Sequence, residues 1–399
     1  MGVAARVSTR VSKPACGTDM TFLRSELEDL ESSHLRRSLR THSECPGREI
    51  EIDGAEVLNF SSNNYLGLAG HPAVADGARA ALCAGSGSTA SRLVTGNLDV
   101  HEALEVQLAS FHRLEAARLF GSGYQANLGL VSCLAGPEDL VISDRLNHAS
   151  IIDGIRLSKA TCRIADHCSV ESVREHLRAS KSFRRRFVIT DSVFSMDGDS
   201  PDLLALRSLC DEFDAFLIVD EAHASGCIGS GRGICADLGV VPDALSSGLG
   251  KAFGSYGGYV AGSRDLVEVL LNKARSFVFS TALPPAVVGA GLASLGVIES
   301  PEGTALRADL KSRIGQLRDG LQELGKLEVG AGDAPIFPFV VGSATAAVSL
   351  CDDLLRNGVF CQAIRPPTVE AGKSRLRIAL SSLHTEDDVS RLLAALKHV

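Results

Sequence analysis

The chain has 399 residues, of which 45% are hydrophobic and 22% are charged, and its formal net charge at pH 7 is −8. This composition predicts a globular protein with room for two or three domain-sized units. The acidic balance argues against nucleic acid as the main partner, because no basic stripe dominates the sequence. The eleven cysteines include no CxxC pair, so we expect reduced thiols, no metal site and a cytoplasmic location.

Residues 1–56 predict an N-terminal extension that carries one helix. The first residues are small, polar and mildly basic, and they lack the apolar core of a secretory signal. A helix is expected from Asp19 through residue 40, because apolar residues recur there at helical spacing. We expect no membrane contact. The longest uncharged stretch, 277–298, is broken by two prolines, which leave a helix of only about thirteen residues, too short to cross a bilayer.

Residues 57–300 predict a large α/β domain. Short apolar runs alternate there with amphipathic segments, and this alternation is typical of a mainly parallel sheet that is covered by helices on both faces. The expected strands are 118–120, 139–143, 161–165, 187–190, 215–220 and 257–262.

Residues 301–399 predict a smaller C-terminal α/β domain. A long charged helix is expected at 302–325, and the final helix begins near Glu386. Between them we expect a helix at 344–357 and strands at 336–342, 359–364 and 376–380.

Polar residues follow several of the expected strands. In open parallel sheets, ligands bind beyond the carboxyl ends of the strands, so these residues are candidates for a site. Taken alone, Asp220 at a strand exit is more often a turn residue, and a single histidine such as His223 or His148 is more often structural. The turn GSGYQAN at 121–127 enters a helix and presents backbone N–H groups to an anion.

Lys251 lies in the glycine-rich segment SSGLGKAFGSYGGY, residues 246–259. An amine, an acid and an anion cradle at one rim predict pyridoxal phosphate, because a lysine forms a Schiff base with its aldehyde. The Asp220 carboxylate would keep the ring nitrogen protonated, since an opposite charge shifts a pKa by about 1–3 units. The glycines are expected to let the backbone approach the cofactor and the lysine swing away.

From residue 56 to the C-terminus, the chain resembles the α-oxoamine synthases, which are pyridoxal-phosphate enzymes of the aspartate-aminotransferase fold, fold type I. The resemblance rests on the motifs NFSSNNYLGLAGHP, GSTASRLVTGN, HEALE, GSGYQAN, NHASIIDG, VFSMDGD, VDEAHASG, GKAFG, FSTALPP and AIRPPTV.

The resemblance implies a role for each matching residue at the cofactor. Lys251 would be the Schiff-base lysine, Asp220 would bind the ring nitrogen and His223 the phenolic oxygen. His148 would stack on the ring. Further contacts are implied for Gly123, Tyr124 and Ser195. Ser280 and Thr281 would reach the phosphate in the neighbouring subunit, which implies a homodimer with the active site at its interface.

The resemblance also implies substrate contacts, and the chain departs from the family pattern at Thr89-Ala90, Asp191, Gly248 and Glu370. Arg365 would take the carboxylate of the amino acid, Asn63 and Thr368 would face the substrate, and Arg36 would match an arginine of the acyl channel. Where the family usually has a hydroxyl residue in contact with the phosphate, this chain has Gly248.

The implied reaction is a decarboxylating condensation of L-alanine with pimeloyl-CoA or a pimeloyl carrier protein, which gives 8-amino-7-oxononanoate for biotin synthesis. Glycine-using relatives of the 2-amino-3-ketobutyrate ligase or 5-aminolevulinate synthase type are the alternative within the family. A non-catalytic partner subunit is the alternative of another class, and the retention of Lys251, Asp220 and His223 argues against it.

Overall fold

The structure is a computed structural model that describes residues 20–328 and 332–397. Its contacts divide the chain into two units, one ending at Arg40 and one beginning at Thr41. In the first unit, helix α1 (Thr21–Ser32) buries none of its residues. The prediction that this helix continues to residue 40 is wrong, because the Ser32 and Ser33 hydroxyls donate back to the Asp29 carbonyl and end it. The predicted start at Asp19 and the residues before it lie outside the described residues.

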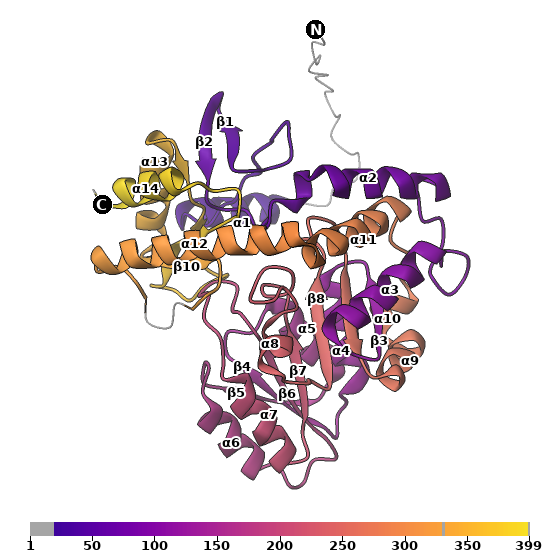
Figure 1. Ribbon diagram of the computed structural model, residues 1–399. Helices are drawn as coiled ribbons and strands as arrows, with labels where there is room; N and C mark the ends of the chain where they lie inside the picture. The colour runs from indigo at the N-terminus through magenta and orange to yellow at the C-terminus, as the bar shows by residue number, and fades with distance from the viewer. Residues whose placement is uncertain (1–19, 329–331, 398–399) are drawn as a thin grey trace. The chain divides into compact units, whose positions relative to one another are not determined.

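A seven-stranded sheet dominates the second unit (Figure 1). Strand β9 runs antiparallel to both of its neighbours, and the other adjacent strands are parallel. The predicted α/β fold with a mainly parallel sheet is therefore confirmed. In spatial order the strands are β3 (Ala116–Phe120), β9 (Gly258–Gly262), β8 (Ala244–Gly248), β7 (Phe216–Asp220), β6 (Arg186–Asp191), β4 (Leu140–Asp144) and β5 (Thr161–Ala165).

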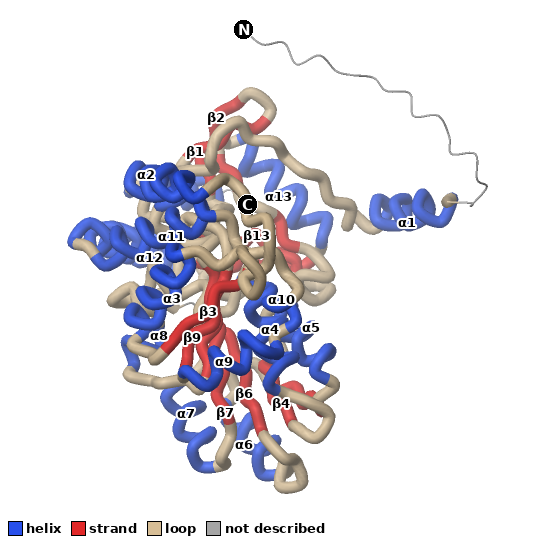
Figure 2. Tube along the Cα trace, turned by 90° about the vertical axis from the view of Figure 1, so that its right-hand side faces the viewer, coloured by secondary structure: helices blue, strands red, loops and turns tan. Residues whose placement is uncertain are grey.

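Helices cover both faces of this sheet, as the tube in Figure 2 shows. The strands alternate between two apolar clusters: Phe187 and Ile189 point into one, and Val188 between them points into the other. Because both faces are buried, these strands read as continuous apolar runs. One face packs on α4 (Gly123–Leu134), α5 (Ala149–Ser158), α9 (Arg264–Lys273) and α10 (Arg275–Val278), and the other on α6 (Val170–Arg178), α7 (Leu203–Glu212) and α8 (Ile234–Leu238).

Two small sheets accompany the large one. The predicted strand 359–364 is split, because its first half pairs with β2 and its second half with β13. The sheets comprise β1 (Glu49–Ile52), β2 (Ala55–Asn59) and β11 (Val359–Phe360), and β10 (Ile336–Gly342), β13 (Ser374–Ala379) and β12 (Ala363–Ile364).

A third apolar cluster contains residues of most of the remaining helices. The predicted domain boundary at 300 falls between α11 and α12, and the cluster contains residues from both sides of it, such as Leu295 and Leu310, so the boundary stays a prediction. The helices are η1 (Leu68–Gly70), α2 (Pro72–Ala81), η2 (Leu82–Ala84), α3 (Asp99–His112), α11 (Pro285–Glu299), α12 (Pro301–Glu323), α13 (Ala344–Arg356) and α14 (Glu386–Leu396).

Helix α11 begins at the second of the two prolines that interrupt the uncharged stretch, and it has 15 residues. Within the described part of the chain, none of the helices combines the length and the apolar character that crossing a membrane requires.

Candidate active site

A cavity of about 1120 Å³ opens at the edge of the large sheet where the parallel strands end. This is the edge that the sequence predicts, because polar residues follow β4, β6, β7 and β8 there. The structure brings six of the predicted site residues to its wall, namely Asn63, His148, Ser195, His223, Lys251 and Thr368.

Lys251 follows strand β8, and its amine faces an imidazole. The Nζ atom lies 2.8 Å from Nε2 of His223. Burial lowers the pKa of Lys251 to about 8, although the nearby carboxylates of Asp220 and Asp191 act to raise it. A neutral amine is the form that acts as nucleophile or base, and this pKa makes that form accessible near neutral pH.

Asp220 ends strand β7 and is buried, with 7% of its surface exposed. Its Oδ2 accepts a hydrogen bond from Nδ2 of Asn127 at 2.5 Å, and its Oδ1 accepts from the backbone N–H of Ala222 at 2.8 Å. Both of these donors are uncharged. Because a buried carboxylate gains most from a cationic partner, a protonated ring nitrogen suits this position.

The turn that follows β3 forms the start of helix α4. Ser122 caps the helix, since its Oγ accepts from the N–H of Gln125 at 3.1 Å, and the first-turn N–H groups at Gly123 and Tyr124 suit an anion. The turn lies directly on strand β9, because a Cβ at Gly258 would stand 2.4 Å from the backbone N of Gly123. Gly258 is therefore required for this close approach.

Tyr124 and His148 lie together at this rim. Their ring centroids are 6.3 Å apart with an interplanar angle of 78°, an edge contact. The hydroxyl of Tyr124 donates to Asp153. The backbone N–H of His148 donates to Oδ2 of Asp191 at 2.9 Å, which fixes the start of α5 against the end of β6.

One of the glycines near Lys251 has a role in packing, rather than the approach to the cofactor that the sequence analysis expects. Gly254 has φ +60°, and a Cβ there would stand 2.2 Å from the backbone N of Ala69. Its role is thus the close packing of the Lys251 loop on the segment at Leu68 and Ala69. At Gly248, by contrast, a Cβ would meet no atom closer than 3.9 Å.

The sequence analysis missed three residues of the site: Arg375 and Arg377, which line the cavity, and the buried Tyr65. The Tyr65 hydroxyl lies 2.7 Å from Nδ1 of His223, and Nη2 of Arg377 lies 3.3 Å from that hydroxyl. Arg377 also donates from Nε to the Ser195 carbonyl at 2.5 Å, and Arg375 donates to Oδ1 of Asp197 at 2.5 Å. The available indication was the period-2 spacing of the two arginines in an apolar strand, which puts both on one face.

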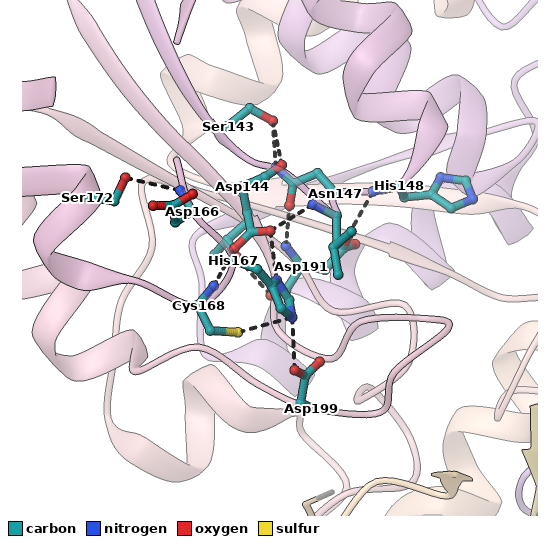
Figure 3. A network of polar contacts seen from close by, with 12 residues as sticks. Ser143, Asp144, Asn147, His148, Asp166, His167, Cys168, Ser172, Asp191 and Asp199 are labelled. Atoms are coloured by element: carbon teal, nitrogen blue, oxygen red, sulfur yellow. Dashed lines mark hydrogen bonds and ion pairs between the residues drawn. The ribbon is translucent and has the colours of Figure 1, made fainter. Parts of the chain in front are cut away.

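A half-buried ion-pair network joins the ends of β4 and β5 to the loop after β6, and Figure 3 shows it. Nδ1 of His167 lies 2.9 Å from Oδ1 of Asp144, and its Nε2 lies 2.8 Å from Oδ2 of Asp199. Burial acts to lower the pKa of His167, but the hydrogen bonds to these two carboxylates prevail and raise it to about 12. The imidazolium therefore holds the loop of Ser195 against the ends of β4 and β5.

The sequence predicts no metal site, yet ligand atoms of Asp144, His167 and Cys168 lie within 4.8 Å of one another. These groups already bond to one another. Besides His167, the Asp144 carboxylate accepts from the backbone N–H groups of Leu146 and Cys168, both at 2.8 Å. The cluster is fully explained as a hydrogen-bonded turn.

Seven predicted residues do not line this cavity, namely Asp220, Gly123 and Tyr124, which are described above, and Arg365, Ser280, Thr281 and Arg36. Arg365 is half-buried between the wall residues Ile364 and Pro367. Ser280 and Thr281 line a separate cavity of about 20 Å³ beside Gly121. Arg36 belongs to the N-terminal unit, where its Nη1 lies 3.0 Å from Oε2 of Glu31.

Two exposed cations also line the large cavity, Arg145 after β4 and Lys373 before β13. Among the residues that the structure describes, neither charged end has a bonded partner. Leu146, Ile152 and Val340 line the same cavity, so its wall combines apolar surface with available positive charge.

Comparison with known proteins identifies the family. The family model of class I and II aminotransferases matches residues 55–396. The 8-amino-7-oxononanoate synthase of Geobacter sulfurreducens is 46% identical over 381 residues, which cover 94% of this chain and 96% of the relative. The enzyme of the same name from Geotalea daltonii is 44% identical, again over 94% and 96% of the two chains.

Solved structures agree with this match. A structure of SPT with pyridoxal phosphate has a TM-score of 0.87 at 28% identity and covers 94% of this chain and 96% of its own. The 8-amino-7-oxononanoate synthase of Francisella tularensis has a TM-score of 0.74 at 29% identity, over 86% and 97% of the chains. The chain therefore belongs to the class I and II aminotransferase family, and within it to the pyridoxal-phosphate-dependent acyltransferases of the 8-amino-7-oxononanoate synthase type.

Proposed function

We propose that this enzyme condenses L-alanine with a pimeloyl thioester, releases carbon dioxide and delivers 8-amino-7-oxononanoate to biotin synthesis. The observation that carries the proposal is that Lys251 and His223 meet at one cavity, with the buried carboxylate of Asp220 near enough to act on the pKa of Lys251. The names of the relatives supply the product.

The residues of the site fit pyridoxal phosphate. When bound, the cofactor supplies an electron sink for a carbanion next to its ring. Lys251 would hold its aldehyde carbon, and Asp220, buried and bonded only by uncharged donors in the contacts given above, would hold its ring nitrogen. The other residues that would hold the group are His223 and Ser195 at the phenolic oxygen, His148 at the ring face, and Gly123 and Tyr124 at the phosphate end.

Lys251 also moves the substrate proton in this proposal. With a pKa of about 8, its amine would be available to accept the α-proton near neutral pH. His223, at 2.8 Å from Nζ, holds the amine at the base of the cavity. Arg365, with its planar guanidinium, would pair with the carboxylate of alanine, and Asn63 and Thr368 would border it.

The pimeloyl chain would occupy the remaining part of the cavity. Its methylene groups suit the apolar surface of Leu146, Ile152 and Val340, and its distal carboxylate suits Arg145. Arg36 remains a second candidate for this carboxylate. Whether the thioester carrier is coenzyme A or a carrier protein, the acyl group is the same.

We also propose a homodimer in the cytoplasm. Ser280 and Thr281 line a cavity of their own and would serve the phosphate in the partner subunit. The ten cysteines in the described part of the chain are free thiols, which suits a reducing compartment.

A matrix of substrates tests the proposal. Protein reconstituted with pyridoxal phosphate is mixed with alanine, glycine or serine, each with pimeloyl-, acetyl- or succinyl-CoA, and products are identified by mass spectrometry. The expected result is efficient turnover of alanine with pimeloyl-CoA. Efficient turnover of glycine with acetyl- or succinyl-CoA, without the alanine reaction, would assign the enzyme to the glycine-using relatives instead.

A further inference from the structure

Tyr65 lies behind His223, in the segment after β2, and none of its surface is exposed. Three polar groups surround its hydroxyl: Nδ1 of His223 at 2.7 Å, Oδ1 of Asn63 at 3.0 Å and Nη2 of Arg377 at 3.3 Å. Arginine is only a donor, so Arg377 occupies one lone pair of the hydroxyl oxygen. The single hydroxyl proton then has two acceptors to choose between, His223 and Asn63.

This choice is coupled to Lys251 through the imidazole of His223. When Lys251 is an ammonium group, it donates a hydrogen bond to Nε2 of His223, so the proton of the neutral imidazole is on Nδ1. That Nδ1–H group donates to the Tyr65 oxygen, and the Tyr65 hydroxyl in turn donates to Asn63. When Lys251 is a neutral amine, Tyr65 donates to Nδ1, and Nε2–H donates to the amine. In both patterns Tyr65, His223 and Lys251 keep their hydrogen bonds with one another. Asn63 loses the Tyr65 donor in the second pattern, but it lines the cavity, where a water molecule can donate to it instead.

We propose that Tyr65 is a positioning residue that sets the tautomer of His223 and lets it change with the proton on Lys251. When Lys251 loses its proton, each proton along this chain of hydrogen bonds moves to the next group. The proton on Nζ moves to Nε2, the proton on Nδ1 moves to the Tyr65 oxygen, and the original Tyr65 proton passes to water at Asn63. Lys251 thus loses its charge, one proton reaches the cavity, and Tyr65 and His223 end neutral.

The groups around this chain keep its middle members uncharged. Burial lowers the pKa of His223 well below its ordinary value, and the nearby cations Lys251 and Arg377 lower it further. Burial raises the pKa of Tyr65 to about 12, although Arg377 acts to lower it. The ionisable groups that face Lys251 and His223 are Asp220, Asp191, Arg377, His148 and Cys227.

The effect of the His223 tautomer on the bound cofactor rests on the proposed function. With the proton on Nε2, His223 can donate a hydrogen bond to the phenolic oxygen of pyridoxal phosphate; with the proton on Nδ1, it cannot. The tautomer itself is a property of the protein without cofactor. It can therefore be measured whether or not the proposed reaction takes place.

Nitrogen NMR of ¹⁵N-histidine-labelled, cofactor-free protein tests the inference, because the shifts of Nδ1 and Nε2 distinguish the two tautomers. The spectrum is followed from about pH 6 to about pH 10, a range that brackets the titration of Lys251. We expect the proton of His223 on Nδ1 at low pH and on Nε2 at high pH, with the midpoint near the lysine pKa of about 8. A tautomer that stays constant over this range in the unmodified protein would overturn the inference.

Tyr65→Phe should abolish this coupled change while the protein stays folded. Tyr259→Phe is the matched control, because Tyr259 is equally buried and its hydroxyl also lies 2.7 Å from a histidine, Nε2 of His112. The control should keep the pH-dependent tautomer of His223. If Tyr65→Phe keeps it too, Tyr65 is not the positioning residue.

Kinetics of the reconstituted enzyme give a second readout. Tyr65→Phe should lower kcat by about tenfold or more with little change in KM for alanine, since only proton placement is disturbed. A protein that shows the tautomer change but turns over no alanine would leave the inference standing and remove the proposed function.

Discussion

At the scale of single residues, the chemistry of this site depends on the pKa of one amine, that of Lys251. Burial brings the pKa of Lys251 to about 8, while two carboxylates limit the effect. His223 receives the amine at 2.8 Å and is itself held by Tyr65. Lysine identity alone does not give this reactivity, because an exposed lysine stays protonated far above neutral pH.

The first prediction concerns the pH dependence of cofactor capture. Only the neutral amine attacks the aldehyde, so capture of pyridoxal phosphate by the cofactor-free protein should quicken as pH rises and level off above the lysine pKa of about 8. Stopped-flow absorbance measures this rate. A midpoint near that of a free lysine side chain would contradict the effect of burial.

Lys251→Ala should fold normally and lose turnover. The loss of a general acid–base group alone costs on the order of 10²–10⁴ in rate. Borohydride reduction of the unmodified holoenzyme, followed by peptide mapping, should place the cofactor on Lys251. A label on any other lysine would show that the site is assigned to the wrong amine.

Asp220→Asn should retain the cofactor and lose most of its activity. The amide has nearly the size of the carboxylate and can still accept from Ala222, but it carries no charge to keep a ring nitrogen protonated. Exchange of the alanine α-proton, followed by proton NMR, measures the loss directly. Exchange at the normal rate would exclude the proposed role of Asp220.

At the scale of elements, the ends of the strands assemble the site. Strands β4, β6, β7 and β8 end at one edge, and the turn after β3 lies on the start of β9. The network of His167 with Asp144 and Asp199 joins the ends of β4 and β5 to the loop after β6. Side chains that are far apart in the sequence are thereby held in fixed positions.

Gly248 at the end of β8 is one of the positions where the sequence analysis finds a departure from the family pattern. A Cβ there has space, since its nearest neighbour would be 3.9 Å away. Gly248→Thr should therefore add a hydroxyl donor for the phosphate, and a hydrogen bond to a charged group is worth about 1.5–3 kcal/mol. Equilibrium dialysis should show tighter retention of pyridoxal phosphate; weaker retention would indicate that the phosphate does not lie at this strand end.

The loop after β4 carries the prediction on the acyl substrate. Arg145→Ala should raise KM for pimeloyl-CoA by about tenfold and leave KM for alanine unchanged, because only the distal carboxylate loses its partner. Lys373→Ala is the control, since it removes the other available cation of the cavity. If Arg36→Ala alone raises KM for the thioester, the carboxylate is bound by the N-terminal unit.

At the scale of the whole molecule, the sequence predicted most of the strands that read as apolar runs. Strand β10, IFPFVVG, agrees with the prediction at both ends, and so does the mixed edge strand β5, TCRIA. Strand β8 was missed because its sequence, ALSSG, looks like a turn. Ser246 can be buried there because its hydroxyl donates a hydrogen bond to Asn127 at 2.6 Å, a partner that no local pattern reveals.

Partners that are distant in the sequence also explain why the sequence analysis missed Tyr65 and Arg377. Tyr65 meets a histidine that is 158 positions away, and Arg377 meets Tyr65 across 312 positions. Spacing rules describe neighbours in one helix or strand, so such contacts become visible only after the chain has folded. The residues at strand exits were predictable because parallel topology itself brings those ends together.

The central claim is that the site at Lys251 joins alanine to a pimeloyl thioester with loss of the alanine carboxyl group. The most direct test supplies alanine labelled with ¹³C in its carboxyl group together with pimeloyl-CoA, and follows carbon dioxide and the amino ketone by mass spectrometry. The account predicts labelled carbon dioxide and unlabelled 8-amino-7-oxononanoate in equal amounts, with neither formed by Lys251→Ala. Label retained in the product, or turnover by Lys251→Ala at the rate of the unmodified enzyme, would contradict it.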